Sequence, residues 1–213
     1  GGTAVVDDCG VCGGNGPDEG FICSNTAWWN EDYPDGVPSE FSSVNTSSIQ
    51  IPYHITLIHI GEDEINSNVW IGAFSDSTYS TCVGFKKWNG TGDEVMLFGD
   101  FEDETCATDN TWGGEQIEVD TQAECEGYEY VWSNPTEGYM APGDVPTFKI
   151  FDEDSLKYYK AEPSSYADLD HDGIGDFAWA TNETMYVMGT LNVIDDCNEE
   201  LGGYAILDEC GDC

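Results

Sequence analysis

The chain contains no arginine and only 5 lysines, against 43 aspartates and glutamates in 213 residues, which gives a formal net charge of −38. Nucleic-acid binding needs clustered lysine and arginine on the phosphates, so this composition excludes nucleic acid as a partner. The same shortage argues against docking on an anionic membrane surface. A chain this acidic repels itself, so we expect it to fold best with bound divalent cations or at high salt.

Long apolar runs are also missing. No run approaches the ~20 residues that a transmembrane helix needs, so we expect no direct membrane insertion. Disorder does not fit either, because 13% of the residues are aromatic and 39% are hydrophobic, which is too much for a solvated acidic tail. No signal peptide is visible, and the start at Gly1-Gly2 suggests a processed or excised piece.

Cysteine, by contrast, is abundant. The nine cysteines are Cys9, Cys12, Cys23, Cys82, Cys106, Cys125, Cys197, Cys210 and Cys213. So many cysteines in an acidic, loop-rich chain predict disulfides and an extracellular or cell-surface location. The CxxC pairs Cys9/Cys12 and Cys210/Cys213 leave zinc binding or redox chemistry as alternatives. A four-cysteine zinc site would require the two chain ends to meet, and no βαβ pattern favours a thioredoxin-like role.

The two ends of the chain repeat one another. Residues 1–12 read GGTAVVDDCGVC and residues 202–213 read GGYAILDECGDC, with seven of twelve positions identical. The second copy starts 201 residues after the first, so we interpret the chain as one repeat unit followed by the start of the next. The alternative is that two cysteine-rich linkers merely resemble each other. Under the repeat interpretation, the chain belongs to a longer array or joins head to tail.

The repeat suggests a disulfide pattern, although sequence alone does not fix connectivity. The bonds expected within the chain are Cys12–Cys23, Cys106–Cys125 and Cys197–Cys210. Cys9 is expected to pair with a preceding unit, and Cys213 beyond the C-terminus. Cys82 is left over as an apolar strand residue.

Alternating and short apolar runs predict strands. Ile49, Ile51, Tyr53, Ile55 and Leu57 fall on one face of a strand over 49–60. Further strands are predicted at 69–74, 81–88, 94–98, 147–151, 156–161 and 185–194. No helical period is sustained, so the predicted fold class is all-β: a β-sandwich, immunoglobulin-like or jelly-roll-like, with disulfide-bonded linkers.

The predicted organisation is a Cys/Gly-rich linker at 1–23, a β-sandwich domain at 24–196 and the start of the next linker at 197–213. An acidic segment at about 101–137 interrupts the strands and is expected to be an insertion closed by a disulfide. Asn89-Gly90 lies between two predicted strands and predicts a hairpin.

Several blocks form a recognisable set: VWIGAF, TCVGFKKW, VMLFGD, GYMAPGDVPTFKIFD and YYKAEPS. Together they resemble a β-sandwich domain repeated in large secreted proteins of marine and freshwater bacteria. The flanks VVDDCGVCGGNG and DDCNEELGGYAILDECGDC resemble the Cys/Gly linkers that join domains in those proteins. The resemblance implies a secreted or surface-attached array and does not imply an enzyme; residues 101–137 depart from the pattern.

The segment DLDHDGIGD at 168–176 has the spacing of a calcium loop. The expected ligands are the side chains of Asp168, Asp170, Asp172 and Asp176 and the carbonyl of Ile174. Calcium is therefore the expected cofactor. The loop resembles those of thrombospondin type 3 repeats and dockerins, but it is not a full EF-hand because Trp179 replaces the glutamate at the twelfth position. The alternative is an acidic surface turn.

No catalytic set is recognisable. The histidines are His54, His59 and His171; His54 and His59 lie five apart in a strand, which places them on opposite faces unless a bulge intervenes. No Ser-His-Asp or Cys-His set and no glycine-rich phosphate loop stands out, so no enzyme is predicted.

Four glycosylation sites are predicted. Asn45, Asn89 and Asn182 lie in N-x-S/T sequons. Ser155 lies in an Asp-Ser-Leu sequence that resembles a bacterial O-glycosylation signal. Chance occurrence of these short motifs is the alternative.

These observations predict a structural repeat unit or subunit of an extracellular bacterial filament or surface adhesin, whose partners are copies of itself joined head to tail. The rival is a calcium-dependent carbohydrate-binding module that takes glycans as ligands. Its candidate sugar-stacking aromatics are Trp28, Trp29, Tyr33, Trp112, Trp132 and Tyr139. An open aromatic platform beside the calcium loop would favour the module, and aromatics buried between units would favour the filament.

Overall fold

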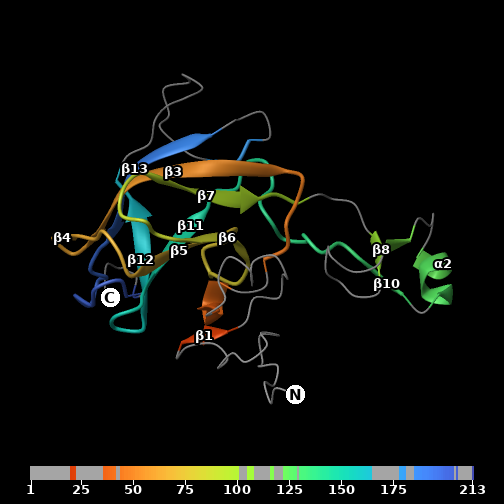
Figure 1. Cartoon of the computed structure of the whole chain (residues 1–213), viewed down its shortest axis with the longest axis horizontal. Coiled ribbons are helices and arrows are strands. Elements are labelled where there is room, and N and C mark those ends of the chain that lie inside the picture. Colours follow the sequence, from red (N-terminus) through yellow and green to blue (C-terminus); the bar gives the residue numbers. More distant parts are fainter. Residues whose placement is uncertain are drawn as a thin grey trace, which may run out of the picture.

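Eight strands form one curled sheet around a hydrophobic core (Figure 1). The computed structural model describes residues 20–22, 36–41, 44–100, 105–107, 116–117, 122–128, 130–164, 178–180, 185–203, 205 and 213. The predicted all-β fold class is confirmed.

The main sheet has eight strands, seven of which lie within two residues of their predicted bounds. The eight strands are β3 (Gln50–Ile60), β4 (Asp63–Glu64), β5 (Val69–Phe74), β6 (Cys82–Lys87), β7 (Asp93–Phe98), β11 (Thr147–Asp152), β12 (Lys157–Pro163) and β13 (Tyr186–Val193). The short strand β4 was not predicted. The sheet follows the order β4-β3-β13-β12-β11-β5-β6, and β7 also pairs with β3. Neighbours are antiparallel except β3 and β13, which run parallel.

The sheet curls until its end strands β6 and β7 touch. These strands are consecutive in sequence but lie at opposite ends of the hydrogen-bonded order. A Cβ at Gly84 in β6 would lie 2.1 Å from the carbonyl oxygen of Met96 in β7. The two backbones therefore approach each other more closely than any side chain at 84 would allow. This contact closes the sandwich over its core.

The hairpin predicted at Asn89-Gly90 is not formed. β6 pairs with β5, and β7 pairs with β3, so the connection crosses from one end of the sheet to the other. Gly90 has a φ of 103°, and a Cβ there would lie 2.5 Å from the backbone oxygen of Asn66. The Asn-Gly pair does mark a tight turn, but tertiary packing selects the strand partners.

The apolar alternation of β3 changes phase near its middle. Ile51, Tyr53 and Ile55 are buried as predicted, but Ile58 is buried further along, and Leu57 is only half-buried. β3 pairs with β7 up to Ile55 and with β4 only from residue 59 onward. The burial pattern therefore changes phase between residues 55 and 59, where β3 passes from its partner β7 to its partner β4. The alternation of apolar residues in the sequence does not show such a change of partner.

Aromatic residues cover one face of β5. Every residue of β5 is buried, which requires cover on both faces. The cover consists of β1 (Phe21–Ile22), β2 (Val37–Pro38) and the 3-10 helix η1 (Ser39–Phe41). The Phe21 ring packs edge-on against Trp70 and Phe151, with centroids 6.0 and 5.4 Å away. Phe41 fills the space above Gly72, where a Cβ would lie 2.3 Å from its ring.

The insertion stands beside the sandwich, at the right of Figure 1. It comprises β8 (Thr105–Ala107), β9 (Gln116–Ile117), α2 (Gln122–Gly127) and β10 (Val131–Ser133), with the sheet order β10-β8-β9. The predicted bond between Cys106 and Cys125 is confirmed and joins β8 to α2. At the base of the insertion, Asn134 Nδ2 donates to Asp100 Oδ1 at 2.7 Å.

Candidate functional site

The predicted calcium ligands Asp168, Asp170, Asp172, Ile174 and Asp176 lie outside the described residues. Within the described part of the chain, no group of three or more His, Cys, Asp or Glu is placed to hold a metal ion. The flanking residues are firmly held: the Ser164 nitrogen donates to the Thr190 carbonyl at 2.8 Å, and the Trp179 nitrogen donates to the Asp144 carbonyl at 2.7 Å. Trp179 is 1% exposed, so the twelfth position belongs to the core.

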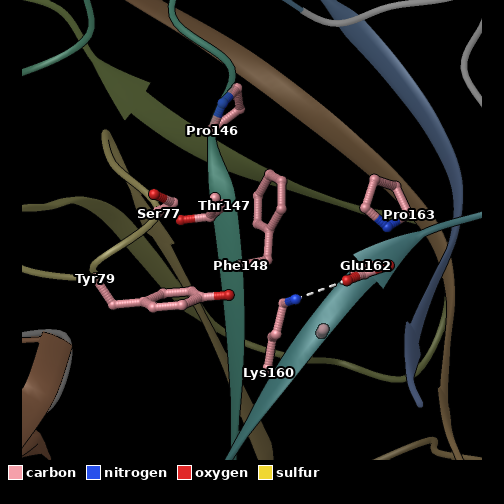
Figure 2. A pocket seen from close by; sticks show the side chains of 9 residues that line it. Ser77, Tyr79, Pro146, Thr147, Phe148, Lys160, Glu162 and Pro163 are labelled. Carbon is pink, nitrogen blue, oxygen red and sulfur yellow. Dashed lines mark ion pairs between the residues drawn. The ribbon is translucent and has the colours of Figure 1, made fainter. Parts of the chain in front are cut away.

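A hollow of about 360 Å³ lies where β11 and β12 meet the loop after β5. It is lined by Ser77, Tyr79, Pro146, Thr147, Phe148, Lys160, Ala161, Glu162 and Pro163. Figure 2 shows the Tyr79 ring entering from one side and Lys160 and Glu162 projecting from β12 on the other. Lys160 Nζ and Glu162 Oε1 form an ion pair at 2.8 Å. Pro163 lies five residues before Asp168 in the sequence.

Asp76 organises the loop that presents Tyr79. Its carboxylate accepts hydrogen bonds from the Thr78 nitrogen at 2.7 Å and the Ser80 hydroxyl at 2.8 Å. Burial raises the pKa of this carboxyl, but the hydrogen bonds from Thr78 and Ser80 outweigh burial and lower the pKa from 3.8 to about 2. The Thr147 hydroxyl donates to the Asp76 carbonyl at 2.7 Å and ties the loop to β11. The hollow is therefore preformed on this side.

A buried lysine lies behind the Tyr79 ring. Lys149 is 7% exposed, and its ammonium group pairs with Glu40 of η1. Its Nζ lies 4.8 Å from the centre of the Tyr79 ring and 5.3 Å from that of Phe74, a distance at which the cation is attracted to the ring faces. Lys149 thus joins the N-terminal cover, the sheet and the wall of the hollow.

The C-terminal linker packs against the sandwich. We call residues 195–203 the linker turn. Asp196 closes it by accepting hydrogen bonds from the backbone nitrogens of Asn198 at 2.8 Å, Glu200 at 3.0 Å and Ala205 at 2.9 Å. The bonds from Glu200 and Ala205 hold the pKa of this carboxyl below its usual value. Gly203 lies so close that a Cβ would meet Asp196 Oδ2 at 2.1 Å.

The linker turn also lies along β12. The backbone nitrogen of Lys160 donates to the Gly202 carbonyl at 3.0 Å. Gly202 is therefore hydrogen-bonded to β12 at this point. A second hollow of about 550 Å³ lies between the linker turn and β12, with Tyr158 and Tyr159 in its wall. The linker turn is thus part of the domain surface.

One predicted disulfide is corrected. Cys197 pairs with Cys213, not with Cys210, and their Cα atoms are 5.5 Å apart. Cys213 therefore does not reach beyond the chain. The spacing between cysteines does not decide between Cys210 and Cys213, because both lie close enough along the chain to reach Cys197. Cys9, Cys12, Cys23 and Cys210 lie outside the described residues.

Cys82 is free and buried, as predicted. Burial raises the pKa of its thiol from 9.0 to about 12, although a weak hydrogen bond to the Gly84 carbonyl opposes the shift. The thiolate is the reactive form of cysteine, so this residue is inert in the folded protein.

The predicted glycosylation sites differ in access. Asn45 Nδ2 donates to the Pro135 carbonyl at 2.8 Å, and the side chain is half-buried. Asn89 is exposed in the turn between β6 and β7. Ser155 is exposed, and its hydroxyl donates to Asp152 Oδ2 at 2.7 Å. Asn182 lies outside the described residues.

Four of the histidines and candidate sugar-stacking aromatics named from the sequence lie in the described part of the chain: His54, His59, Tyr139 and Trp132. His54 and His59 are half-buried, and His54 Nδ1 lies 3.9 Å from Glu94 Oε1. Tyr139 is a core residue whose hydroxyl accepts a hydrogen bond from the Asn45 nitrogen. Trp132 is half-buried in the insertion. The remaining singled-out residues, His171, Trp28, Trp29, Tyr33 and Trp112, lie outside the described part of the chain.

Sequence reasoning did not find Tyr79, Lys149 or Asp196. The run Asp76-Ser77-Thr78 is typical of a side-chain-capped turn and was a usable signal for the loop. Nothing in the sequence indicates that Tyr79 and β12 line the same hollow, because the loop after β5 and β12 are distant in sequence.

Comparisons with protein-family models, curated proteins and solved structures found no match to this chain. Among the described helices, none is long and apolar enough to cross a membrane. The two described disulfides are typical of proteins that fold outside the reducing cytoplasm.

Proposed function

We propose that the chain is a structural repeat unit of an extracellular bacterial filament or surface adhesin, stabilised by calcium and disulfides, with further copies of itself as partners. The linker turn supports this most. A linker that merely joins independent domains has no need to pack on them, whereas this one is hydrogen-bonded to β12 and is closed by Asp196. Identical head-to-tail contacts of this kind propagate into filaments.

Both ends of the unit meet the same β11–β12 hairpin. On the incoming side, a Cβ at Gly20 would lie 3.3 Å from the Phe151 ring and 3.6 Å from Leu156. On the outgoing side, Gly202 lies against Tyr159. Contacts of both ends with one hairpin support a defined direction for neighbouring units along the proposed array.

Electron microscopy of the native protein, with sedimentation at high concentration, tests the proposal. Filaments or linear arrays are expected, and a discrete monomer contradicts the proposal. Asp196→Ala should open the linker turn and speed cleavage by a glutamate-specific protease at Glu199 and Glu200. Asp195→Ala is the matched control, because it removes the adjacent exposed carboxylate and leaves the acceptor of the turn in place.

The second candidate is a calcium-dependent carbohydrate-binding module, which the hollow at Tyr79 favours. An aromatic ring beside a Lys160–Glu162 pair offers a stacking face together with hydrogen-bonding groups, as sugar ligands require. The test is a glycan array probed with and without calcium. Binding that Tyr79→Ala abolishes, and that Tyr128→Ala on the insertion preserves, would favour the module. Absence of binding in both conditions contradicts it.

A further inference from the structure

The Tyr79 ring is held in place by a strained backbone. Tyr79 has a φ of 57°, a left-handed conformation that is unfavourable for a bulky aromatic residue. The Asp76 carboxylate holds the residues on both sides of it, through the Thr78 nitrogen at 2.7 Å and the Ser80 hydroxyl at 2.8 Å. The Tyr79 nitrogen itself donates to the Asp76 carbonyl at 3.3 Å. A ring held in this way loses little freedom when a ligand stacks on it.

The back of the Tyr79 ring is already occupied. Lys149 Nζ lies 4.8 Å from the ring centre, and the Phe74 ring packs edge-on with its centroid 5.5 Å away. Neither residue lines the hollow at Tyr79, so the ring turns its remaining surface toward that hollow (Figure 2). Because Lys149 already uses the attraction of the ring for a cation, a positively charged ligand gains little from stacking here.

A hydrogen-bond donor and an acceptor lie side by side across the hollow. Lys160 and Glu162 are two residues apart in β12, so their side chains project from the same face of the strand. Lys160 Nζ and Glu162 Oε1 are 2.8 Å apart, and the side chains are 34% and 48% exposed. Two adjacent ring hydroxyls of a pyranose in the gauche arrangement have nearly the same spacing, and each hydroxyl both donates and accepts. One hydroxyl therefore accepts a hydrogen bond from Lys160 while its neighbour donates to Glu162, and the ion pair is kept.

The charges around the hollow favour an uncharged ligand. Among the described residues of its lining, Lys160 and Glu162 are the charged ones, and they neutralise each other. The net charge of −38 on the whole chain repels anions, and Lys149 behind the ring disfavours cations. The volume of about 360 Å³ is near the lower end of the range of ~300–1,000 Å³ for small-molecule sites. This volume suits a ligand of one or two sugar rings better than a long chain.

We infer that the hollow at Tyr79 binds a neutral pyranose, which stacks on Tyr79 and places two adjacent ring hydroxyls on Lys160 and Glu162. The inference rests on the second candidate function given above, carbohydrate binding, and adds the class of sugar and the contacts that hold it. These contacts come from side chains of the loop after β5 and of β12, and they involve no metal ion.

The test is titration of the isotope-labelled whole chain with the methyl glycosides of glucose, mannose and galactose, followed by NMR. At least one glycoside should bind and shift the amide signals of Tyr79 and Lys160. In a methyl pyranoside, the 3-hydroxyl belongs to every pair of adjacent ring hydroxyls. The 3-deoxy form of the bound sugar should therefore bind about tenfold more weakly, because a charged side chain loses its partner, whereas the 6-deoxy form should bind unchanged. Equal affinities of the two deoxy sugars overturn the inference, as does failure of all three glycosides to bind.

The acid form of the bound sugar, with a carboxylate at carbon 6, tests the preference for an uncharged ligand. This form should bind more weakly than the neutral sugar, and the difference should shrink at high salt as the charges are screened. Equal or tighter binding of the acid form at low salt overturns the assignment of a neutral ligand.

Variants locate the site on the protein. Tyr79→Ala should weaken binding about tenfold, whereas Tyr79→Phe keeps the ring and should keep the binding. Glu162→Gln should also weaken binding, and the matched control Glu94→Gln, which removes an exposed carboxylate on β7, should not. Melting temperatures show which variants are folded. Glu162 is exposed, so Glu162→Gln still decides the question if Tyr79→Ala does not fold.

The outcomes separate this inference from the proposed functions. Sugar binding that survives both Tyr79→Ala and Glu162→Gln overturns the hollow as the site and leaves the carbohydrate-binding module as a candidate with a site elsewhere. Absence of binding both to the glycosides and on the glycan array contradicts the inference and the module together. Neither result changes the filament proposal, which electron microscopy decides.

Discussion

Gly202 lies directly against Tyr159: a Cβ at position 202 would be 2.6 Å from the Tyr159 Cβ. This contact joins the linker turn to β12, together with the hydrogen bond from the backbone nitrogen of Lys160 to the Gly202 carbonyl. The linker turn is therefore packed against the sandwich, and substitutions in it can show how much this packing contributes to the free energy of unfolding.

Gly202→Ala should destabilise the protein more than Gly61→Ala. Gly202 has a φ of 65° and Gly61 a φ of 63°, so both variants suffer the same left-handed strain of about 1 kcal/mol. Gly61 has nothing within 4 Å of its Cβ position, whereas at Gly202 overpacking against Tyr159 should add roughly 1–3 kcal/mol. Urea denaturation measures both free energies of unfolding. Equal losses would show that the linker turn does not pack as described.

Gly84→Ala should disrupt the closure of the sandwich. The added methyl group would meet the Met96 carbonyl oxygen at 2.1 Å, and a backbone atom cannot move aside as a flexible side chain does. We expect a loss of about 3 kcal/mol or more, from overpacking at a rigid site. Gly127→Ala in α2 is the control, since no atom lies within 4 Å of its Cβ position. Thermal unfolding followed by circular dichroism gives the comparison, and an unchanged melting temperature for Gly84→Ala contradicts the predicted β6–β7 contact.

Asp76 should make stability depend on pH below about 4. Its pKa is lowered from 3.8 to about 2 in the folded protein, so its contribution is present above the unfolded pKa and is lost as pH falls from about 4 toward 2. Because the side chain is partly exposed, we expect roughly 1 kcal/mol after allowing for solvent screening. The difference in free energy of unfolding between wild type and Asp76→Asn should shrink across this window. Ser80→Ala, which keeps the carboxylate and removes one donor, should give an intermediate curve; a pH-independent difference would exclude Asp76 as the source.

Calcium should raise the melting temperature. Four of the 5 lysines form ion pairs within the sandwich, namely Lys86, Lys87, Lys149 and Lys160. They leave most of the 43 carboxylates without a protein cation. A site in the 168–176 segment should therefore stabilise the fold by about 2.7 kcal/mol at a calcium concentration one hundred times its Kd.

The calcium test uses calorimetry of metal-free protein with added calcium. Asp170→Ala and Asp172→Ala should lose the calcium-dependent increase, and Asp63→Ala in the exposed strand β4 should keep it. If the three variants respond alike, the effect of calcium is general charge screening and the loop is not a site.

The sequence predicted some contacts well and others not at all. The Cys106–Cys125 bond closes a short loop and was predictable from spacing. The partner of Cys197 was not, because Cys210 and Cys213 are both within reach along the chain and only the folded structure distinguishes them. The hollow at Tyr79 was also unpredictable, since it assembles residues from β11, β12 and the loop after β5.

The sequence by itself determined most strands of the main sheet and the strongly acidic, arginine-free composition. Alternation of apolar and polar residues is a local property of an extended backbone, so Ile51, Tyr53 and Ile55 identify their buried face without knowledge of any partner. The tertiary structure decided which strands pair. Asn89-Gly90 predicted a hairpin of β6 and β7, yet β7 pairs with β3 and β6 pairs with β5. The choice depends on how the whole sheet buries its apolar faces, and that energy is a sum over residues far apart in the chain.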